Sequence, residues 1–548
     1  MRIALAQLNY TIGDFDLNTA KIIETIQTCR LKGADLVVFA ELSVCGYPPR
    51  DFLEFDDFIQ KSHSAIDTIA AHCTDIGAIV GAPSRNPDSK GKNLFNSAWL
   101  LTDGKVQSLA HKALLPTYDI FDEYRYFEPN RNYECITFKG VKIALTICED
   151  IWNLVPDPLY ISNPMDVLAA QNPDIMINIA ASPFNYDQQK TRLEILRANT
   201  SQYKIPLVYV NQVGAQTELL FDGNSCVLDS GSNQVASCKA FDEDICTVDF
   251  DPEQKTLTSE LTVKSKNSSK AGLIHDALVM GIRDYFAKMG FSKAILGLSG
   301  GIDSAVTLAL ASEALGNKNV YAVLLPSEYS SDHSIGDAVA LAKNLDCKYD
   351  TISIAEGYNT LHDSLLPYFK ELPFSVAEEN IQARVRAILL MALANKFGYI
   401  LLNTSNKSEA AVGYGTLYGD MCGGISVLGD VYKTEVYELA HFINREKEII
   451  PTNSIVKPPS AELRPGQKDS DSLPDYDILD KILYNYIEMR KSPADLLESG
   501  FDEAIVKRVL RMVNTNEWKR HQTPPILRVS PKAFGQGRRM PIVGRYLA

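Results

Sequence analysis

A single loop between a predicted strand and a predicted helix limits what the C-terminal half of this chain can fold into. Residues 297–304 read GLSGGIDS; they overlap the end of a short apolar run at 294–298 and begin a segment whose apolar residues keep helical spacing. Glycines let backbone N–H groups approach an anion without a Cβ clash, and a helix N-terminus adds its dipole. The sequence therefore predicts an anion-binding loop formed by Gly297, Leu298, Ser299, Gly300, Gly301, Ile302, Asp303 and Ser304.

Apolar strands and helical segments alternate regularly around that loop. The predicted strands cover residues 294–298, 320–325, 349–354 and 399–402. This spacing indicates βαβ units on a parallel sheet. The N-terminal half is also predicted to be a layered α/β domain, with strands at 3–8, 35–40, 77–81, 96–101, 141–148, 174–181, 206–211 and 225–228.

The chain is too long, at 548 residues, for one ordinary hydrophobic core. Between residues 251 and 272 it turns polar and reads SKNSSKAG near its end, a composition typical of linkers. We therefore predict a first domain over residues 1–250, a linker over 251–272, and a second domain over 273–548 that includes a C-terminal tail.

Charge and composition exclude several classes of function. The formal net charge of −14 disfavours nucleic-acid binding, which demands clustered Lys and Arg. Because the chain has neither a signal-peptide start nor an apolar run of about 18 residues, we expect a cytoplasmic protein without membrane association. Its ten cysteines lack disulfide or zinc spacing. Small molecules are the partners that remain.

The segment SGGIDS at 299–304 resembles the PP-loop of the ATP pyrophosphatases, a family that cleaves ATP to AMP and pyrophosphate while adenylating a substrate. It lacks the Gly-Lys-Ser/Thr of a Walker A loop, so the sequence does not indicate a kinase-like grip on a γ-phosphate. The resemblance implies ATP as a co-substrate. Asp303 is of the ligand type that Mg²⁺ takes beside phosphates, so we expect Mg²⁺ as the cofactor.

Other segments of the second half resemble the NAD synthetases. LNTSNKSE at 402–409 and GYGTLYGD at 413–420 are similar to a region in which Thr404 is expected to contact ATP and Glu409 to bind magnesium. NIQAR at 380–384 and the basic KRHQ at 519–522 are similar to segments that contact the dinucleotide. The resemblance implies a deamido-NAD site that includes Asn380, Glu409 and Lys519.

Three segments of the first half place a carboxylate, a lysine and a cysteine at or just after predicted strand ends. They are FAEL around Glu41, HKALLP around Lys112 and ICEDIW around Cys148. Together these groups suit amide hydrolysis, because a carboxylate can activate a thiol, the thiolate can attack a carbonyl, and a lysine can stabilise the oxyanion. Cys45, four residues after Glu41, is the competing thiol.

These contexts resemble the Glu-Lys-Cys triad of the nitrilase superfamily, and the resemblance spans most of residues 1–250. It implies an αββα sandwich with Glu41 as general base, Lys112 as electrostatic stabiliser and Cys148 as nucleophile. It also implies that Tyr118 and Ser182 bind L-glutamine. A basic residue often follows that serine by six positions, where this chain has Gln188; whether Gln188, Lys190 or Arg192 contacts the glutamine carboxylate stays open.

A nitrilase-like domain followed by a PP-loop domain is the architecture of the glutamine-dependent NAD synthetases. The resemblance implies a ligase that adenylates deamido-NAD with ATP and amidates it with ammonia from glutamine, releasing NAD, AMP, diphosphate and glutamate. It also suggests a homo-oligomer and a shielded path for ammonia. Two alternatives stay open: another carboxylate substrate for the second half, or an inactive first half in an enzyme that uses free ammonia.

Overall fold

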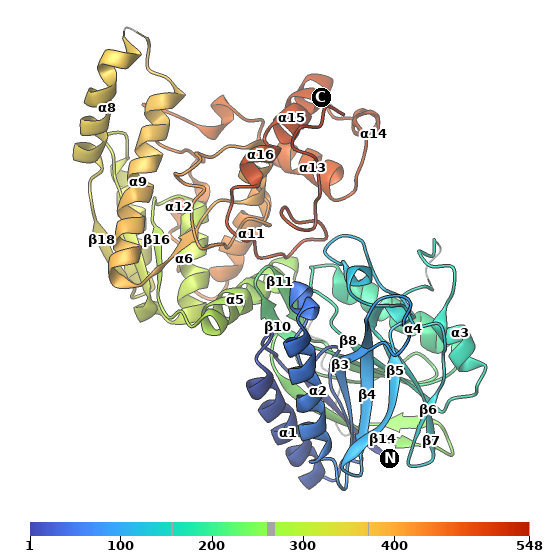
Figure 1. Cartoon of the computed structure of the whole chain (residues 1–548). Helices are drawn as coiled ribbons and strands as arrows, with labels where there is room; N and C mark the ends of the chain where they lie inside the picture. The colour runs from blue at the N-terminus through green and yellow to red at the C-terminus, as the bar shows by residue number, and fades with distance from the viewer. Residues whose placement is uncertain (155–156, 260–268, 371, 547–548) are drawn as a thin grey trace. The chain divides into compact units, whose positions relative to one another are not determined.

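The computed structural model describes residues 1–154, 157–259, 269–370 and 372–546. The chain divides into two compact units, Met1–Asn267 and Ser268–Ala548, which Figure 1 colours from blue to green and from green to red. In the described part of the chain, no helix combines the length and the apolar character needed to cross a bilayer.

The first unit contains two large sheets. One has the strand order β15-β14-β1-β2-β3-β4-β5, and the other has the order β13-β12-β9-β8-β7-β6. The first is made of β1 (Arg2–Gln7), β2 (Leu36–Val38), β3 (Gly77–Arg85), β4 (Leu94–Thr102), β5 (Lys105–His111), β14 (Asp244–Asp251) and β15 (Thr256–Thr258). The second is made of β6 (Ile136–Phe138), β7 (Val141–Ile147), β8 (Ile175–Ala180), β9 (Leu207–Asn211), β12 (Cys226–Leu228) and β13 (Gln234–Ser237).

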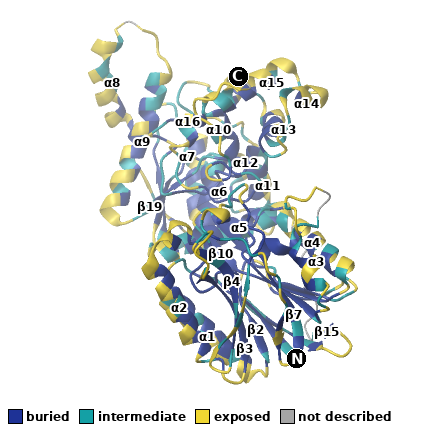
Figure 2. Ribbon diagram, turned by 45° about the vertical axis from the view of Figure 1, so that its right-hand side comes forward, coloured by how far each residue is buried: buried dark blue, intermediate teal, exposed yellow. Residues whose placement is uncertain are grey.

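The two sheets pack face to face between helical layers. Along β1, Ile3 and Leu5 join the core shared with the second sheet, whereas Ala4 and Ala6 join the core beneath the helices, as strand alternation requires. The first sheet is covered by α1 (Phe15–Leu31) and α2 (Asp56–Ala70), and the second by α3 (Pro164–Ala169) and α4 (Gln188–Tyr203). This arrangement confirms the αββα prediction. Figure 2 shows the strands buried and the outer helix faces exposed.

The second unit is built on a five-stranded sheet in which every recorded pairing is parallel, in the order β18-β17-β16-β19-β20. The order reverses at β16, which creates the switch point where such sheets bind ligands. The strands are β16 (Ala294–Gly297), β17 (Val320–Leu324), β18 (Lys348–Thr351), β19 (Ile400–Asn403) and β20 (Ile425–Ser426). This sheet confirms the α/β prediction for the second half.

Helices surround this sheet. The α8–α9 pair contributes Tyr358, Ile381 and Val385 to a core with strand residues Ile295 and Val323. The helices are α5 (Lys270–Met289), α6 (Ile302–Leu315), α7 (Asp332–Asn344), α8 (Ala355–Phe369), α9 (Val376–Phe397), α10 (Lys407–Val412), α11 (Lys433–Ile443) and α12 (Thr452–Val456). A separate C-terminal core holds α13 (Tyr476–Ile487), α14 (Pro493–Glu498) and α15 (Glu503–Thr515), followed by α16 (Glu517–Arg520).

The predicted linker at 251–272 is too long at both ends. Residues Thr256–Thr258 form β15 and pair with β14, and α5 begins at Lys270 behind its N-cap Ser269. The sequence signal for β15 is weak because only Leu257 of that strand is buried. Residues 260–268 of the predicted linker lie outside the described residues.

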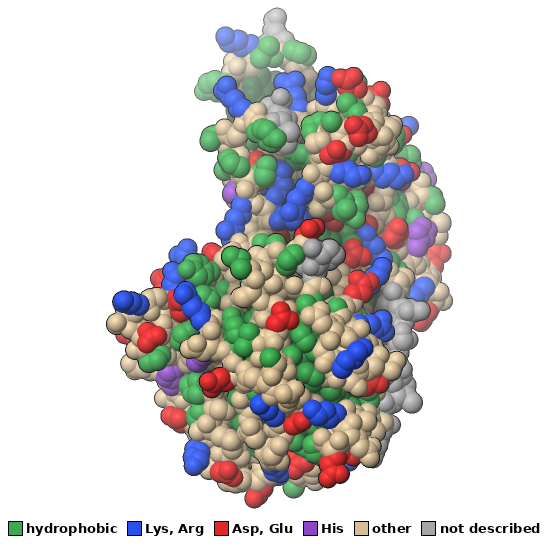
Figure 3. Space-filling view, turned by 90° about the vertical axis from the view of Figure 1, so that its right-hand side faces the viewer, with side chains coloured by type: hydrophobic (Ala, Val, Ile, Leu, Met, Phe, Trp, Pro, Cys, Tyr) green, Lys and Arg blue, Asp and Glu red, His purple; other side chains and the backbone are tan. Residues whose placement is uncertain are grey.

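The surface carries charges of both signs. On the face drawn in Figure 3, acidic and basic side chains lie interspersed among polar and hydrophobic ones. No single sign of charge therefore covers that face.

Candidate active sites

The cysteine of the first unit lies in a strained turn at the end of β7. Cys148 opens the 3-10 turn Cys148–Ile151 with a φ of +44°, a left-handed conformation that is uncommon for a residue with a side chain. Asp150 holds this turn, because one carboxylate oxygen accepts from Ile147 N at 3.0 Å and the other from Ala113 N and Leu114 N at 2.9 Å each. Asp150 therefore ties the cysteine turn to the segment that follows Lys112.

Glu41 and Lys112 meet in the interior of the same unit. Both side chains are fully buried, and Lys112 Nζ lies 2.7 Å from Glu41 Oε1. The other oxygen of Glu41 accepts from Ala181 N at 3.0 Å. Asn96 Nδ2 also donates to Glu41 Oε1, at 2.7 Å. Hydrogen bonds to both oxygens therefore fix the orientation of the Glu41 carboxylate.

A second carboxylate, Glu123, also holds Lys112. Its two oxygens lie 2.9 and 2.8 Å from Lys112 Nζ, and one of them accepts from Tyr47 OH at 3.0 Å. The sequence analysis missed Glu123 because it lies in a short 3-10 turn, Glu123–Arg125, outside any strand end. Lys112 therefore forms ion pairs with two carboxylates, which hold its ammonium group next to Glu41.

Electrostatics keep the thiol protonated in the resting site. Burial raises the pKa of Cys148 well above its ordinary value, and the charge of Glu41 adds to that effect. Burial opposes the charge of Lys112, but Glu123 and Glu41 outweigh it and raise the pKa of the lysine. Burial also raises the pKa of Glu123 to about 7. The nucleophile therefore needs a base, and Glu41 is the carboxylate whose charge acts most strongly on it.

Tyr118 points to the carboxylate next to the cysteine. Its hydroxyl donates to Glu149 Oε1 at 2.9 Å, and the Tyr160 hydroxyl donates to the same oxygen at 3.1 Å. Glu149 is only 5% exposed, and burial raises its pKa. Burial disfavours the charge of Glu149, and a substrate that carries an ammonium group would favour it again by pairing with the carboxylate.

The other predicted glutamine contacts differ in how they are placed. Ser182 is buried, and its backbone N–H donates to Asn211 Oδ1 at 2.8 Å. Gln188 begins α4 and accepts from Asn185 Nδ2 at 3.1 Å. Arg192 forms a buried ion pair with Asp222 at 2.9 Å, which commits its guanidinium to the core. Lys190 is exposed. Of the two basic alternatives, the structure thus disfavours Arg192.

Cys45, the competing thiol, lies in a hydrophobic cluster with Leu42 and Phe221 and is fully buried. Its Sγ contacts the Leu42 carbonyl at 3.7 Å. Burial raises the pKa of this thiol as well. With no lysine or carboxylate among its recorded partners, Cys45 has the surroundings of a packing residue.

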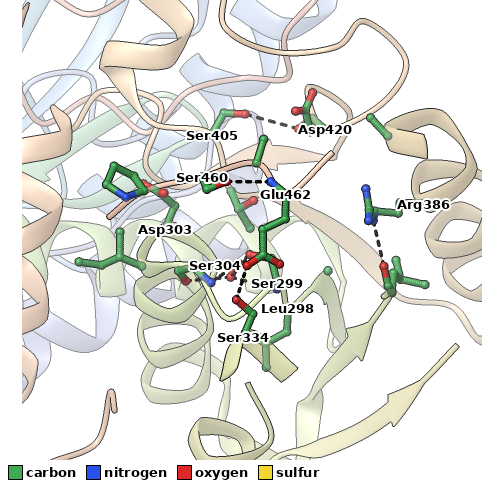
Figure 4. A pocket seen from close by; sticks show the side chains of 18 of the residues that line it. Leu298, Ser299, Asp303, Ser304, Ser334, Arg386, Ser405, Asp420, Ser460 and Glu462 are labelled. Atoms are coloured by element: carbon green, nitrogen blue, oxygen red, sulfur yellow. Dashed lines mark hydrogen bonds between the residues drawn. The ribbon is translucent and has the colours of Figure 1, made fainter. Parts of the chain in front are cut away.

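In the second unit, a cavity of about 310 Å³ lies over the carboxyl ends of β16, β17 and β19 (Figure 4). Every residue of the 297–304 loop except Gly300 lines it, as do Thr404 and Glu409. Gly300, within the loop, has a φ of +81°, and a Cβ there would be 2.1 Å from the Ser334 carbonyl oxygen. Only glycine fits at that position.

The two serines of the loop are bonded to each other and to the loop backbone. Ser299 Oγ and Ser304 Oγ are 3.1 Å apart, and Gly301 N donates to Ser299 Oγ at 3.2 Å. Ser299 N donates to Ser304 Oγ at 3.3 Å. The N–H groups of Ser299 and Gly301 therefore have local acceptors that an incoming phosphate could replace.

Asp303 and Glu409 face the same cavity and share one lysine. Lys433 Nζ contacts Asp303 Oδ2 and lies 3.7 Å from Glu409 Oε1. Burial, followed by the charge of Asp303, raises the pKa of Glu409 to about 8. Two carboxylates, one in the phosphate loop and one on the same cavity wall, fit the way Mg²⁺ is bound together with nucleotides. Among the residues described, no group of three or more His, Cys, Asp or Glu forms a metal cluster.

Two cations on the cavity wall have no motif that reveals them in the sequence. Lys433 begins α11 and its side chain is only 3% exposed. Arg386 lies on α9, donates from Nε to the Leu325 carbonyl at 3.0 Å, and has a pKa lowered to about 10 by burial (Figure 4). Lys433 and Arg386 therefore give positive charge to the wall of the cavity in which we expect the ATP phosphates to bind.

Asn380 and Lys519 do not line this cavity. The amide oxygen of Asn380 accepts from Thr416 Oγ1 at 2.6 Å. Lys519 Nζ donates to the carbonyls of Gly413 and Gly415 at 2.9 and 3.1 Å. Both residues therefore contact the loop that follows α10. A positive charge at a helix C-terminus is favourable, which gives Lys519 a structural role as well.

The comparisons with known proteins agree with this division. Residues 2–258 match the family described as carbon-nitrogen hydrolase, and residues 274–523 match NAD synthase. A glutamine-dependent NAD(+) synthetase from Synechocystis sp. is 45% identical and covers 98% of each chain. The Thermotoga maritima protein of that name is 39% identical over all of this chain and 99% of its own length.

Solved structures give the same result. The glutamine-dependent NAD+ synthetase from Acinetobacter baumannii, in complex with adenosine diphosphate, is 38% identical, with a TM-score of 0.79 over 99% of this chain and 98% of that chain. The enzyme from Cytophaga hutchinsonii shares the fold at 21% identity, with a TM-score of 0.84. With two sites of this chemistry and relatives this similar over the whole chain, the protein belongs to the glutamine-dependent NAD(+) synthetase family.

Proposed function

We propose that this enzyme converts deamido-NAD to NAD, using ATP to activate the nicotinate carboxylate and glutamine as the source of ammonia. The observation that carries the proposal is the presence in one chain of a buried Glu41–Lys112 pair whose charges act on Cys148, and of a phosphate loop that contains Asp303 and lines one cavity with Glu409. The first set is suited to amide hydrolysis and the second to nucleotide chemistry.

In the first unit, Glu41 takes the proton from Cys148 Sγ, and the resulting thiolate attacks the side-chain carbonyl of glutamine. Lys112 stabilises the negative oxygen of the tetrahedral adduct. When the C–N bond breaks, the proton held by Glu41 passes to the leaving nitrogen, so ammonia departs and a thioester remains. Glu41 then deprotonates a water that hydrolyses this thioester to glutamate and restores the thiol.

We assign the recognition of the glutamine α-ammonium to Glu149. Replacing it by glutamine keeps the size of the side chain and removes the charge. We expect the Glu149→Gln variant to lose about 10- to 100-fold in kcat/KM for glutamine, mainly through KM, because a charge-assisted hydrogen bond contributes roughly 1.5–3 kcal/mol. Steady-state glutamate release checks this. NAD formation from ammonium is the control, and a loss there equal to the loss with glutamine would refute the assignment.

In the second unit, the 297–304 loop and Thr404 bind the ATP phosphates, and Asp303 and Glu409 would hold Mg²⁺. When bound, this ion supplies positive charge to the phosphate oxygens and to the pyrophosphate leaving group. The nicotinate carboxylate attacks the α-phosphorus, which forms the adenylate and releases pyrophosphate. Ammonia then attacks the activated carbonyl carbon, and AMP leaves.

Asn380 and Lys519 remain proposed contacts of the dinucleotide. Because both bond to the 413–416 loop rather than facing the cavity, we propose that they act by holding this loop against the substrate. Glu409 lies in the cavity wall and can face either the ion or the dinucleotide.

The substrate of the second unit is tested directly with the purified enzyme. We expect NAD, AMP and pyrophosphate in equal amounts from deamido-NAD, ATP and Mg²⁺, with either glutamine or ammonium as nitrogen source. Nicotinate mononucleotide and aspartate serve as alternative carboxylate substrates. AMP formed with one of these, and none with deamido-NAD, would leave the adenylation chemistry intact and overturn the substrate.

A further inference from the structure

The N-cap of α10, Asn406, bonds to two of the acidic residues that line the cavity, Asp303 and Glu409. It is fully buried, and its Nδ2 donates to Asp303 Oδ1 at 2.9 Å. Its Oδ1 accepts from Glu409 N at 3.0 Å, while its own N–H donates to Glu409 Oε2 at 3.3 Å. One asparagine thus fixes two carboxylates that belong to different helices.

These bonds divide the four carboxylate oxygens into two pairs. Asp303 Oδ1 and Glu409 Oε2 are taken by Asn406. Asp303 Oδ2 and Glu409 Oε1 are the oxygens that Lys433 Nζ approaches. A third carboxylate nearby, Asp469, has its two oxygens occupied by the hydroxyls of Tyr414 and Tyr476. The pair facing Lys433 is therefore the one already directed at a cation.

Lys433 lies where its charge would be unfavourable without the two acids. It is the first residue of α11, and the N-terminus of a helix carries partial positive charge that disfavours a cation. The ammonium also lies 5.4 Å from the centre of the Tyr476 ring, a second favourable contact on the same wall. The carboxylate pair is also unfavourable alone, because two partly buried negative charges close to each other repel.

We propose that the Lys433 ammonium holds the place of the magnesium ion in the nucleotide-free enzyme, and that Asn406 is the positioning residue that keeps Asp303 Oδ2 and Glu409 Oε1 directed at that place. Lys433 leaves this position for the phosphate oxygens when the metal–nucleotide complex enters. The flexible four-carbon side chain allows the move without a change of backbone. This inference rests on the magnesium site of the proposed function.

The test measures Mn²⁺ binding, in place of Mg²⁺, from the electron paramagnetic resonance signal of the free ion in the absence of nucleotide. We expect weak binding by the wild type and binding at least about tenfold tighter by Lys433→Met, because the competing charge is gone. Adding Asn406→Ala to Lys433→Met should weaken binding by about 10- to 100-fold, the usual effect of losing a residue that orients metal ligands. Asn444→Ala, at the other end of α11, is the matched control and should bind as the wild type does.

The outcomes separate the two proposals. If wild type with ATP binds no Mn²⁺ beyond ATP alone, the magnesium site of the proposed function is wrong. If it does bind, but Lys433→Met binds no more tightly than wild type without nucleotide, the placeholder role of Lys433 is refuted. Equal affinities of Lys433→Met with and without Asn406→Ala would refute the positioning role. Lys433→Gln, which removes the charge but keeps a polar amide that can donate a hydrogen bond, replaces Lys433→Met if thermal unfolding shows that the latter does not fold.

Discussion

The Cys148→Ala variant should lose glutamine-dependent NAD formation by about 10⁴-fold or more while its ammonium-dependent activity stays near that of the wild type. Removing the attacking atom abolishes the thioester route, and catalytic groups that act as a unit lose nearly all of their effect together. The substitution is small and lies at the end of β7, so the sheet of the first unit is preserved. NAD formation with each nitrogen source, at saturating deamido-NAD and ATP, measures both activities.

The matched control is Cys45→Ala, which removes another buried thiol of the same unit, one that follows Glu41 by four residues. We expect this variant to keep both activities and to lose only stability, by roughly 1 kcal/mol for a small buried side chain. Loss of glutamine-dependent activity in Cys45→Ala with retention in Cys148→Ala would reverse the assignment of the nucleophile. Glutamine-dependent activity retained in both variants would mean that neither thiol is the nucleophile. A wild type that forms NAD from ammonium but not from glutamine would revive the alternative that the first unit does not act as a glutaminase.

Residues at strand ends are the part of the sites that the sequence makes visible. Glu41, Lys112 and Cys148 each follow a strand, and the structure places Glu41 against Lys112, where its charge raises the pKa of Cys148. The phosphate loop of the second unit can be predicted from the sequence because the turn requires glycine. The requirement is clearest at Gly300, where φ is positive and a Cβ would clash with the Ser334 carbonyl oxygen. Local patterns of this kind need no knowledge of distant contacts.

What the sequence does not reveal depends on pairs that are far apart along the chain. Glu123 reaches Lys112 from an irregular segment, and Asn406 meets Asp303 only after the parallel sheet has formed. The same is true of β14, whose antiparallel pairing with β1 joins opposite ends of the first unit. Single polar residues such as Glu123 and Asn406 belong to no periodic sequence pattern, so their role in a site cannot be predicted from the sequence.

The basic C-terminal segment shows that one charge cluster can suit both a structural role and a binding role. Lys519 bonds to backbone carbonyls after α10, while its contact with the dinucleotide stays a prediction. Arg520 donates to the Ala411 carbonyl at 2.6 Å and pairs with Glu517 at 2.7 Å. These bonds satisfy the open end of a short helix. Charge content alone cannot distinguish such a cap from a binding site.

Asp303→Asn should give the complementary result to Cys148→Ala, with NAD formation reduced by about 10²-fold or more for both nitrogen sources. The amide keeps the shape of the side chain but removes a charge that pairs with Lys433 and that we propose binds the metal. Glutamate release from glutamine should stay within about threefold of wild type, because the residues of amide hydrolysis lie in the other unit.

The control for Asp303→Asn is Glu313→Gln on the same helix, α6. Glu313 also pairs with a cationic partner, the His275 ring at 3.1 Å, but it does not line the cavity. This variant should keep NAD formation with both nitrogen sources. If Asp303→Asn keeps its ammonium-dependent activity, Asp303 is not a ligand for the metal–nucleotide complex, and the phosphates must be bound without it. If Glu313→Gln loses activity to the same extent, the loss reflects damage to α6 rather than the missing carboxylate.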